Sequence, residues 1–493
     1  MATPPAQTRD SSDRIILVAW LAVVAVLPFF IYPAALLTSG QHAGGTTSSP
    51  TTPVASPEMV WIFPRVLLLL LFSVPGLLWL RKRFSLDRFS LLVTLYALTF
   101  LLSAAFSRDE LQYILLGASG RMDGLLYAIG LVTFMLVGYF LGKENPNLLL
   151  VFYLAISVGG VLEVVVLAAQ RLGLDWLGPI TRGIPYTDIL TGTIGNPGML
   201  AGMLLPISLL SLGAAQSPRL SPRLRTWATV VAILTAAGIA LTGNKSSFYG
   251  MILLLVAYVI LQRSVRSLLL AGTVFIALVF APQLVPNRTT YEHPLIPTAS
   301  IAARPALWGL TLKAIAATPG QPLIGAGPDG LRMAILRNER LIPDMLDVYR
   351  ISERWPENRK ITSIEPVYSP TDPVRSRAFA VRFSDNAMGN LYRVNVDKAH
   401  DLFLDRAVRS GVVSALIWAL LYFIPIFKLI RSREPLTNAV ALALAGLTFY
   451  YLFWFPVPQV EPLHVALLSL AWGVASTTQR AEVTRAAPTK PAP

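Results

Sequence analysis

The sequence contains no cysteine among its 493 residues. Disulfide bonds, thiolate metal ligands and cysteine nucleophiles are therefore excluded. Charged residues are also scarce, at 14% of the chain, whereas an average soluble domain has about 25%. The charges are unevenly spread, because they gather between long apolar runs. These shortages argue against a disulfide-stabilised small domain and against a soluble globular enzyme.

Long apolar runs recur from one end of the chain to the other. Hydrophobic residues make up 54% of the sequence and the mean hydropathy is +0.58. A helix of about 20 apolar residues crosses the hydrocarbon core of a bilayer. We therefore predict an all-α polytopic membrane protein with about twelve transmembrane helices. The predicted spans are residues 15–37, 60–80, 91–106, 124–142, 148–169, 198–215, 226–242, 248–262, 268–281, 411–427, 439–455 and 463–476.

One long polar segment interrupts these runs and divides the chain. We predict an N-terminal transmembrane bundle at 1–283, a large extracytoplasmic loop with short helices at 284–400, further transmembrane helices at 401–477, and a polar tail at 478–493. Within the loop, residues 301–317 have helical periodicity. Residues 343–395 look irregular, apart from a short strand predicted at 379–383.

Lysine and arginine are distributed unequally between the short connections. Residues 38–59 contain neither, whereas Arg81, Lys82 and Arg83 follow the second run directly. With a cytoplasmic N-terminus, the cytoplasmic segments hold about 18 basic residues and the opposite short loops about five, which is the expected bias. We therefore predict a multi-pass protein of the cytoplasmic (inner) membrane, with both termini in the cytoplasm and the loop outside. The net charge of +14 is then explained by topology and anionic lipid head groups, so we expect membrane lipids and no nucleic acid as partners.

Polar side chains gather where the predicted helices reach the outer side. Arg121 precedes the fourth run, Asn196 precedes the sixth, and Lys245 follows the seventh. Arg304 lies on the predicted helix of the loop, and His400, one of four histidines, closes the loop. The predicted topology brings all five to one membrane face. Cationic side chains at this depth are costly unless they are paired or solvated, and they often mark a site.

These residue types suit the binding of a pyrophosphate. Arginine offers a planar fork to phosphate oxygens and lysine offers a point charge. A neutral imidazole at His400 can take the proton of an attacking hydroxyl. The positive end of a helix dipole favours the neutral ring. Asp401 and Asp405 oppose that effect, but they can also orient the ring or bind an acceptor.

Each of these residues also has a structural interpretation. Arg304 can pair with a loop carboxylate, Lys245 can be a plain loop charge, and Arg121 can lie against lipid head groups. The Asn-Pro pair at Asn196 is also a typical helix start, with proline in the first turn. Arg65, within the second run, fits a structural or snorkelling charge.

Five segments of the chain resemble, in the same order, the motifs of one family. Residues 116–124 resemble G-x-x-x-R-x-x-G, residues 192–197 resemble G-T-x-G-N-P, and residues 241–246 resemble L-T-x-S-R-G. Residues 304–308 and 322–328 resemble R-x-x-x-W followed by P-L-x-G-x-G-P, and residues 396–405 resemble V-D-R-A-H-N-x-x-L-D. Over about residues 90–425 the chain is thus similar to the O-antigen ligase and O-antigen polymerase superfamily of bacterial membrane glycosyltransferases.

The resemblance implies a glycosyltransferase that needs neither a metal nor a cofactor. Its donor would be a glycan on polyprenyl (undecaprenyl) pyrophosphate, and its acceptor a glycan, a lipid or a protein. Carried across, His400 assists the acceptor hydroxyl, while Arg304, Lys245 and Arg121 bind pyrophosphate.

Asn196 and Asp401 complete the substrate-binding set that we predict. Two positions depart from the family pattern, because Lys245 stands where arginine is usual and Asp401 where asparagine is usual. A flippase for the same lipid-linked glycan, or an inactive structural partner in envelope polysaccharide assembly, remains an alternative. A transporter would place polar residues near the bilayer midplane, where the sequence offers few besides Glu163 and Arg65.

Overall fold

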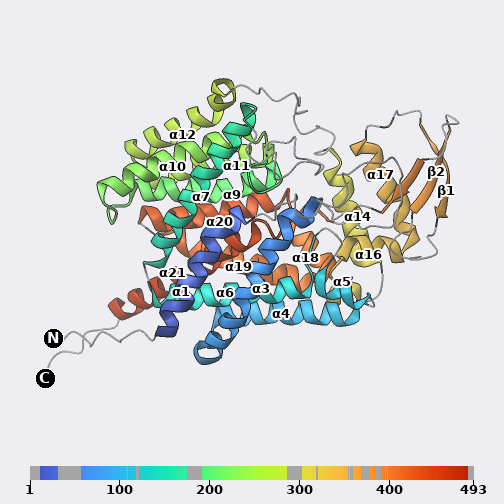
Figure 1. Ribbon diagram of the computed structural model, residues 1–493, viewed down its shortest axis with the longest axis horizontal. Coiled ribbons are helices and arrows are strands. Elements are labelled where there is room, and N and C mark those ends of the chain that lie inside the picture. The colour runs from blue at the N-terminus through green and yellow to red at the C-terminus, as the bar shows by residue number, and fades with distance from the viewer. Residues whose placement is uncertain are drawn as a thin grey trace, which may run out of the picture.

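The fold is given by a computed structural model, in which α-helices dominate (Figure 1). It describes residues 11–30, 57–107, 109–117, 121–145, 147–174, 191–285, 302–317, 320–353, 355, 359–367, 378–384, 390–394, 396, 398–432 and 434–486.

Long helices build the main body of the molecule. Their bounds are α1 (Ser11–Val26), α3 (Pro57–Arg83), α4 (Arg88–Phe106), α6 (Leu125–Glu144), α7 (Leu148–Arg171), α9 (Pro197–Gln216), α10 (Pro222–Leu241), α11 (Lys245–Gln262), α12 (Val265–Leu284), α19 (Val412–Leu429), α20 (Pro435–Tyr451) and α21 (Glu461–Ala486). Within the described part of the chain, ten segments are long and apolar enough to cross a membrane, namely α1 with the short helix that follows it, α3, α4, α6, α7, α9, α10, α11, α12 and α19.

The predicted polytopic helical protein is therefore confirmed in its class. The two remaining predicted spans coincide with α20 and α21, whose described side chains are mostly buried inside the bundle. The span predicted at 439–455 is wrong at its end, because α20 stops at Tyr451. Trp454 and Phe455 lie in the connection that follows, where Pro456 disfavours helical backbone for the residue before it.

The first helix is also shorter than the predicted run of 15–37. It ends at Val26 and continues only as a 3-10 turn, η1 (Leu27–Phe29), which contains Pro28. Proline has no backbone N–H to donate to the preceding turn, so the regular helix is interrupted there. Residues 31–37 lie outside the described residues.

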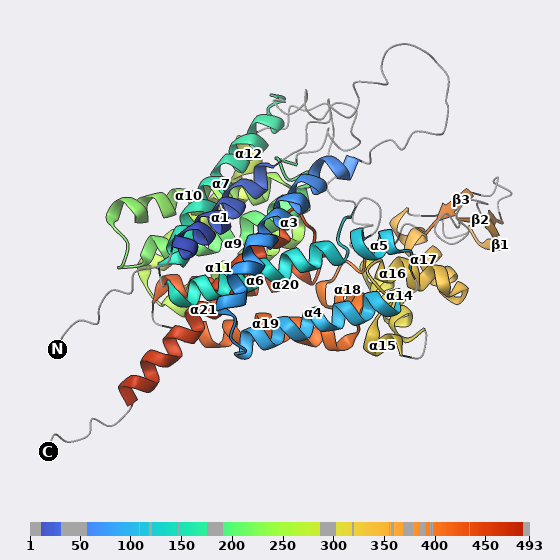
Figure 2. The same ribbon diagram turned by 60° about the horizontal axis from the view of Figure 1, so that its bottom comes forward.

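One end of the bundle is held by polar contacts between helix termini. Arg83, at the end of α3, pairs with Asp13 in α1 at 2.6 Å and with Glu144 in α6 at 3.2 Å. Ser217, after α9, donates to Glu434, the residue before α20, at 2.7 Å. The C-terminal end of α21 lies at this end in both views (Figures 1 and 2).

The described part of the predicted loop lies at the other end, which we call the loop end (Figure 2). It contains the short helices α14 (Arg304–Ala316), α15 (Gln321–Ile324), α16 (Gly330–Arg337), η2 (Glu339–Leu341) and α17 (Ile342–Ser352). An antiparallel sheet follows, with the strands β1 (Ile361–Val367), β2 (Ala378–Phe383) and β3 (Asn390–Arg393) in the order β1-β2-β3. The helix predicted at 301–317 and the strand predicted at 379–383 are thus both present.

The loop end has a small hydrophobic core of its own. Leu310, Ile335, Met345 and Val381 come from α14, α16, α17 and β2, and each is 1% exposed or less. Val408, of the helix that precedes α19, belongs to the same core. The prediction that 343–395 is irregular apart from one strand is therefore wrong for α17, β1 and β3. Their short, interrupted apolar patterns become regular elements only because they pack on one another.

A separate short helix, α18 (Leu402–Ser410), lies between His400 and the apolar helix α19. We expected the polar segment to run directly into the apolar helix. Gly411, with a φ of +87°, separates the two helices instead. A side chain at Gly411 would overlap the carbonyl oxygen of Leu323, so only glycine fits this break.

Candidate active site at the loop end

His400 lies in a tight turn immediately before α18. Its φ is +54°, in the left-handed region that non-glycine residues seldom occupy. Asp401 caps the helix, because its Oδ1 accepts a hydrogen bond from the backbone N–H of Leu404 at 2.9 Å. Burial raises the pKa of Asp401, while hydrogen bonds from the backbone of Leu404 and Phe403 oppose that shift. Aspartate and asparagine cap helices about equally well, so the departure at Asp401 preserves the helix start.

Aromatic rings surround the imidazole of His400. The ring of Phe455 meets it edge to face at a centroid distance of 4.8 Å, and the ring of Trp454 does so at 5.7 Å. Trp454 and Phe455 are themselves parallel, with an interplanar angle of 8°. The connection between α20 and α21 thus forms one wall of the site. We call Trp454 and Phe455 the aromatic wall.

Two predicted arginines lie on this aromatic wall. The guanidinium carbon of Arg304 is 5.8 Å from the ring centroid of Trp454, and that of Arg121 is 5.0 Å from the ring centroid of Phe455. Arginine stacks favourably on aromatic faces because the ring quadrupole attracts the cation. The wall therefore holds two cations beside one imidazole.

Arg304 has no acidic partner among the described residues. Its Nη1 donates to the carbonyl oxygen of His400 at a long 3.4 Å, and no Asp or Glu of the described ranges forms an ion pair with it. Burial lowers the pKa of Arg304 to about 10, so the side chain is still a cation at neutral pH. Within the described residues, the pairing of Arg304 with a loop carboxylate is not observed.

Gly198, two residues after Asn196, lies close to Trp454 and to Asn244, the residue before Lys245. The Oδ1 of Asn196 caps α9 by accepting from the backbone N–H of Gly198 at 2.8 Å. A Cβ atom at Gly198 would lie 2.8 Å from the Trp454 ring and 3.1 Å from Nδ2 of Asn244, so these groups are neighbours.

Lys245 comes directly after Asn244, which caps α11 by accepting from the backbone N–H of Ser247 at 2.9 Å. The side chain of Lys245 is partly exposed and forms no ion pair or hydrogen bond with the described part of the chain. Its charge is therefore available to a ligand.

A buried ionic cluster lies next to the His400 turn. Oδ2 of Asp123 accepts from Nζ of Lys398 at 2.5 Å and from Nη1 of Arg409 at 3.0 Å. Asp405 completes the cluster at 3.9 Å from each of the two cations. Burial alone would raise the pKa of Asp123, but Arg409 and Lys398 together hold it below its usual value. Asp405, which we considered as a group that orients the ring, faces these cations instead.

A second buried pair holds α18 against the bundle. Arg406 pairs with Glu461 of α21 and donates to the hydroxyl of Tyr96 in α4 at 2.7 Å. The hydroxyl of Tyr127 in α6 donates to the same glutamate at 2.8 Å. α18 is thus tied to three helices of the main bundle.

The segment 322–328 supports α18 from the loop side. The backbone N–H of Ala326 donates to the carbonyl of Val408 at 2.8 Å, and that of Gly327 donates to the carbonyl of Arg409 at 3.1 Å. Gly325 has a φ of +84°, and a side chain there would overlap the Arg409 carbonyl. The glycines of this motif are therefore explained by close backbone packing.

Arg65 and Glu163 both form hydrogen bonds with backbone groups in or near the segment 191–196. Arg65 donates from Nε to the carbonyl of Leu27 at 2.8 Å, and from Nη2 to the carbonyl of Thr193 at 2.8 Å. Oε2 of Glu163 accepts from the backbone N–H of Thr193 at 2.9 Å, and its Oε1 accepts from the hydroxyl of the same residue. The structural interpretation of Arg65 is confirmed, and the pair secures the chain that leads to Asn196.

The structure brings His400, Arg304 and Arg121 together around a feature that the sequence did not point to, the aromatic wall. For Lys245 it places only the preceding residue, Asn244, near Gly198 and so near the wall. Trp454 lay within a predicted transmembrane span, where an aromatic residue attracts no notice. Asp123, Lys398 and Glu461 looked like ordinary loop charges, because the sequence does not reveal that they are buried. Pro456, which disfavours helical backbone at Phe455, was the available signal that this stretch is not regular helix. Among the described residues, His, Asp and Glu side chains form no group of three that could hold a metal ion.

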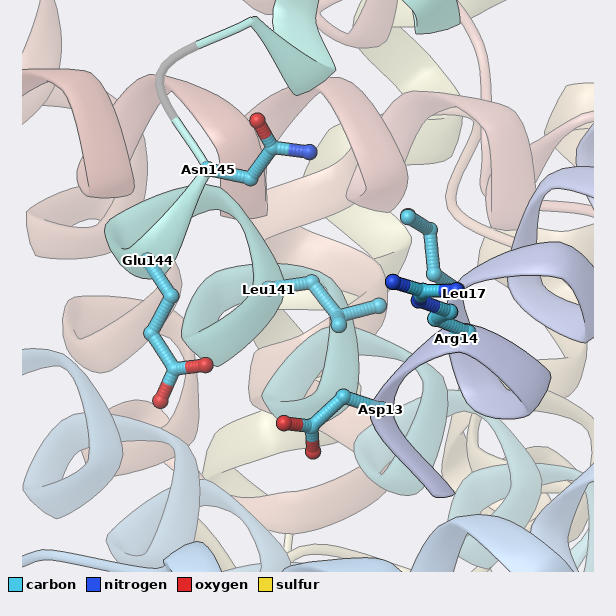
Figure 3. A pocket seen from close by; sticks show the side chains of 6 residues that line it. All are labelled: Asp13, Arg14, Leu17, Leu141, Glu144 and Asn145. Carbon is cyan, nitrogen blue, oxygen red and sulfur yellow. The ribbon is translucent and has the colours of Figure 1, made fainter. Parts of the chain in front are cut away.

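A small cavity lies away from this site, at the opposite end of the bundle (Figure 3). Its volume of about 20 Å³ suffices for about one water molecule. The carboxylate of Asp13 there already accepts hydrogen bonds from Arg83 and from the indole N–H of Trp79. The cavity offers no room for a substrate. Its lining comes from α1 and α6 with the adjoining turn, namely Asp13, Arg14, Leu17, Leu141, Glu144 and Asn145.

The chain was also compared with known proteins. No model of a protein family matches it, and no functionally curated protein matches it either.

Proposed function

We propose that this protein is a membrane glycosyltransferase that transfers glycan from a polyprenyl pyrophosphate to an acceptor hydroxyl. The observation that carries the proposal is the environment of Arg304. This cation lies on the Trp454 ring, beside His400, without a carboxylate partner among the described residues. A half-buried cation whose neighbours in the described part of the chain are aromatic side chains, Trp454 and Tyr450, and one carbonyl is suited to an anionic ligand. The five motifs that resemble the O-antigen ligase and polymerase superfamily favour the same chemistry.

In the proposed reaction, the acceptor oxygen attacks the anomeric carbon of the donor glycan. The bond from that carbon to the pyrophosphate oxygen breaks, and polyprenyl pyrophosphate leaves with the electron pair. His400 takes the proton of the acceptor hydroxyl as general base. Arg304, Lys245 and Arg121 stabilise the charge that develops on the leaving pyrophosphate.

The aromatic surroundings add hydrogen-bond donors for the same ligand. Trp308 lies one turn after Arg304 on α14, and its ring is 6.3 Å from that of Phe453. The indole N–H groups of Trp308 and Trp454 are buried and have no acceptor among the described residues. An unmet buried donor costs about 1–3 kcal/mol. Phosphate or sugar oxygens would satisfy both groups.

The transporter alternative has less support than the enzyme. It needs polar groups near the midplane that a substrate can reach. The two residues that the sequence offered, Arg65 and Glu163, are instead committed to the backbone near Leu27 and Thr193. A silent structural partner has no use for a cation such as Arg304, which lies beside a histidine and has no carboxylate partner in the part of the chain that the structure describes.

The proposal is tested with purified protein in liposomes that contain a polyprenyl-pyrophosphate glycan and candidate acceptors. An enzyme releases polyprenyl pyrophosphate in step with glycosylated acceptor, at a rate proportional to protein. Movement of the donor between leaflets without bond cleavage would instead indicate a flippase. Inactivity with every acceptor class, despite donor binding, would favour the structural partner.

We also propose that the loop end faces the outside of the cytoplasmic membrane and that the end with Arg83 faces the cytoplasm. The excess of basic residues at the latter end supports this orientation. A reporter fused near Pro343, in α17, should be active only in the external compartment. Cytoplasmic activity at that position would reverse the orientation.

A further inference from the structure

Asp123 forms ion pairs with residues on both sides of His400 in the sequence. Its carboxylate is 4% exposed and binds Lys398, which precedes His400 by two residues. The same oxygen binds Arg409 in the last turn of α18, and the backbone carbonyl of Asp123 accepts from Nη2 of Arg409 at 2.6 Å. Asp123, in the segment before α6, therefore binds both the chain just before the His400 turn and the helix α18 that follows it.

The turn at His400 needs such support. A left-handed conformation is strained for a non-glycine residue, because its Cβ approaches the following carbonyl oxygen. It persists only where the surroundings determine it fully. Here Ala399, directly before His400, is completely buried, and Asp401, directly after it, caps α18. Lys398, two residues before His400, is held by its ion pair with Asp123.

The cluster is balanced in charge and closed to water. Asp123, Lys398, Asp405 and Arg409 are all 4% exposed or less, and they comprise two carboxylates and two cations. Loss of one partner from a buried pair leaves an uncompensated charge, which is strongly destabilising. The cluster therefore holds its geometry stiffly.

The segment that carries Asp123 also reaches the imidazole from the other side. Arg121, two residues earlier, stacks on Phe455, and Phe455 meets the His400 ring edge to face. Backbone and ring of His400 are thus both tied to residues 121–123.

We propose that Asp123 is a positioning residue for His400, which it keeps against Phe455 through its ion pairs with Lys398 and Arg409. This inference rests on the proposed function, in which His400 is the general base. A misplacement of about 1 Å in such a group can reduce the rate about 100-fold.

Asp123→Asn tests this role, because the amide keeps the size of the side chain and removes its charge. We expect kcat for glycan transfer to fall about 10- to 100-fold, with little change in KM for the polyprenyl-pyrophosphate donor. Glu461→Gln is the matched control. It breaks the equally buried pair with Arg406 on the same helix without touching Lys398. It should lower thermal stability by a similar amount and leave kcat nearly unchanged.

The two variants are then combined with His400→Ala. If Asp123 acts through the histidine, Asp123→Asn lowers kcat in the parent but not the residual rate of His400→Ala. An equal reduction in both backgrounds would overturn the inference, and so would a parental kcat in Asp123→Asn alone. If Asp123→Asn does not fold, Lys398→Gln takes its place, because Asp123 then keeps its ion pair with Arg409. Lys398→Gln should likewise lower kcat in the parent and leave the residual rate of His400→Ala unchanged. An equal reduction in both backgrounds, or a parental kcat in Lys398→Gln alone, would overturn the inference. A parental rate in His400→Ala itself would refute the base assignment, and therefore the proposed mechanism, separately.

Discussion

The guanidinium of Arg304 lies over the ring of Trp454, 5.8 Å from its centroid, and reaches the carbonyl oxygen of His400 with Nη1. The arginine comes from the predicted loop, the tryptophan from the connection after α20, and the histidine from the turn before α18. A cation and an imidazole are thus brought to one aromatic wall by three distant segments. Each part of this arrangement can be changed separately.

Arg304→Lys keeps the charge but loses the planar fork and the stacking on Trp454. We expect a large loss of transfer, about 10-fold or more, because lysine cannot bind pyrophosphate in a bidentate manner. The amount of protein in the membrane should be unchanged. The measurement is kcat/KM for the lipid-linked donor. Parental kcat/KM in Arg304→Lys would leave only a structural role for this residue.

Trp454→Leu removes the aromatic face beneath Arg304. Stacking of this kind contributes about 0.5–2 kcal/mol, so kcat/KM for the donor should fall about 2- to 30-fold. Trp454→Phe retains an aromatic face and should lose less. Equal losses in the two variants would mean that packing volume, and not the ring, matters here.

Much of this fold could be predicted from the sequence, because a run of about 20 consecutive apolar residues identifies a transmembrane helix. The ends of helices were less predictable: α20 ends at Tyr451, and Gly411 separates α18 from α19. The strands β1 and β3 were missed because short strands depend on their partners.

The charged residues of the candidate site could be predicted from the sequence, whereas its aromatic residues could not. His400, Arg304 and Arg121 stand out in an apolar chain, where a cation needs a reason. Trp454 does not stand out, because tryptophan is common near membrane interfaces. The burial of Asp123 with Lys398 was equally hidden, since the two lie 275 residues apart in sequence.

The motif at 322–328 allows a test of the support beneath the site. Gly325→Ala places a methyl group against the carbonyl of Arg409, at a φ of +84°. Gly320 has nearly the same φ, +86°, but open space around it, so Gly320→Ala reports the backbone strain alone. The overlap should make Gly325→Ala less stable than Gly320→Ala by about 1–3 kcal/mol. Thermal unfolding in detergent measures the difference, and equal midpoints would refute the packing role of Gly325.

The most direct test of the account is the rate of glycan transfer by His400→Ala, measured as release of polyprenyl pyrophosphate and formation of glycosylated acceptor in the same liposomes. A general base contributes about 10²–10⁴-fold to the rate. The account predicts a loss of that size, with donor binding preserved, because Arg304, Lys245 and Arg121 remain in place. Transfer by His400→Ala at the parental rate would contradict it.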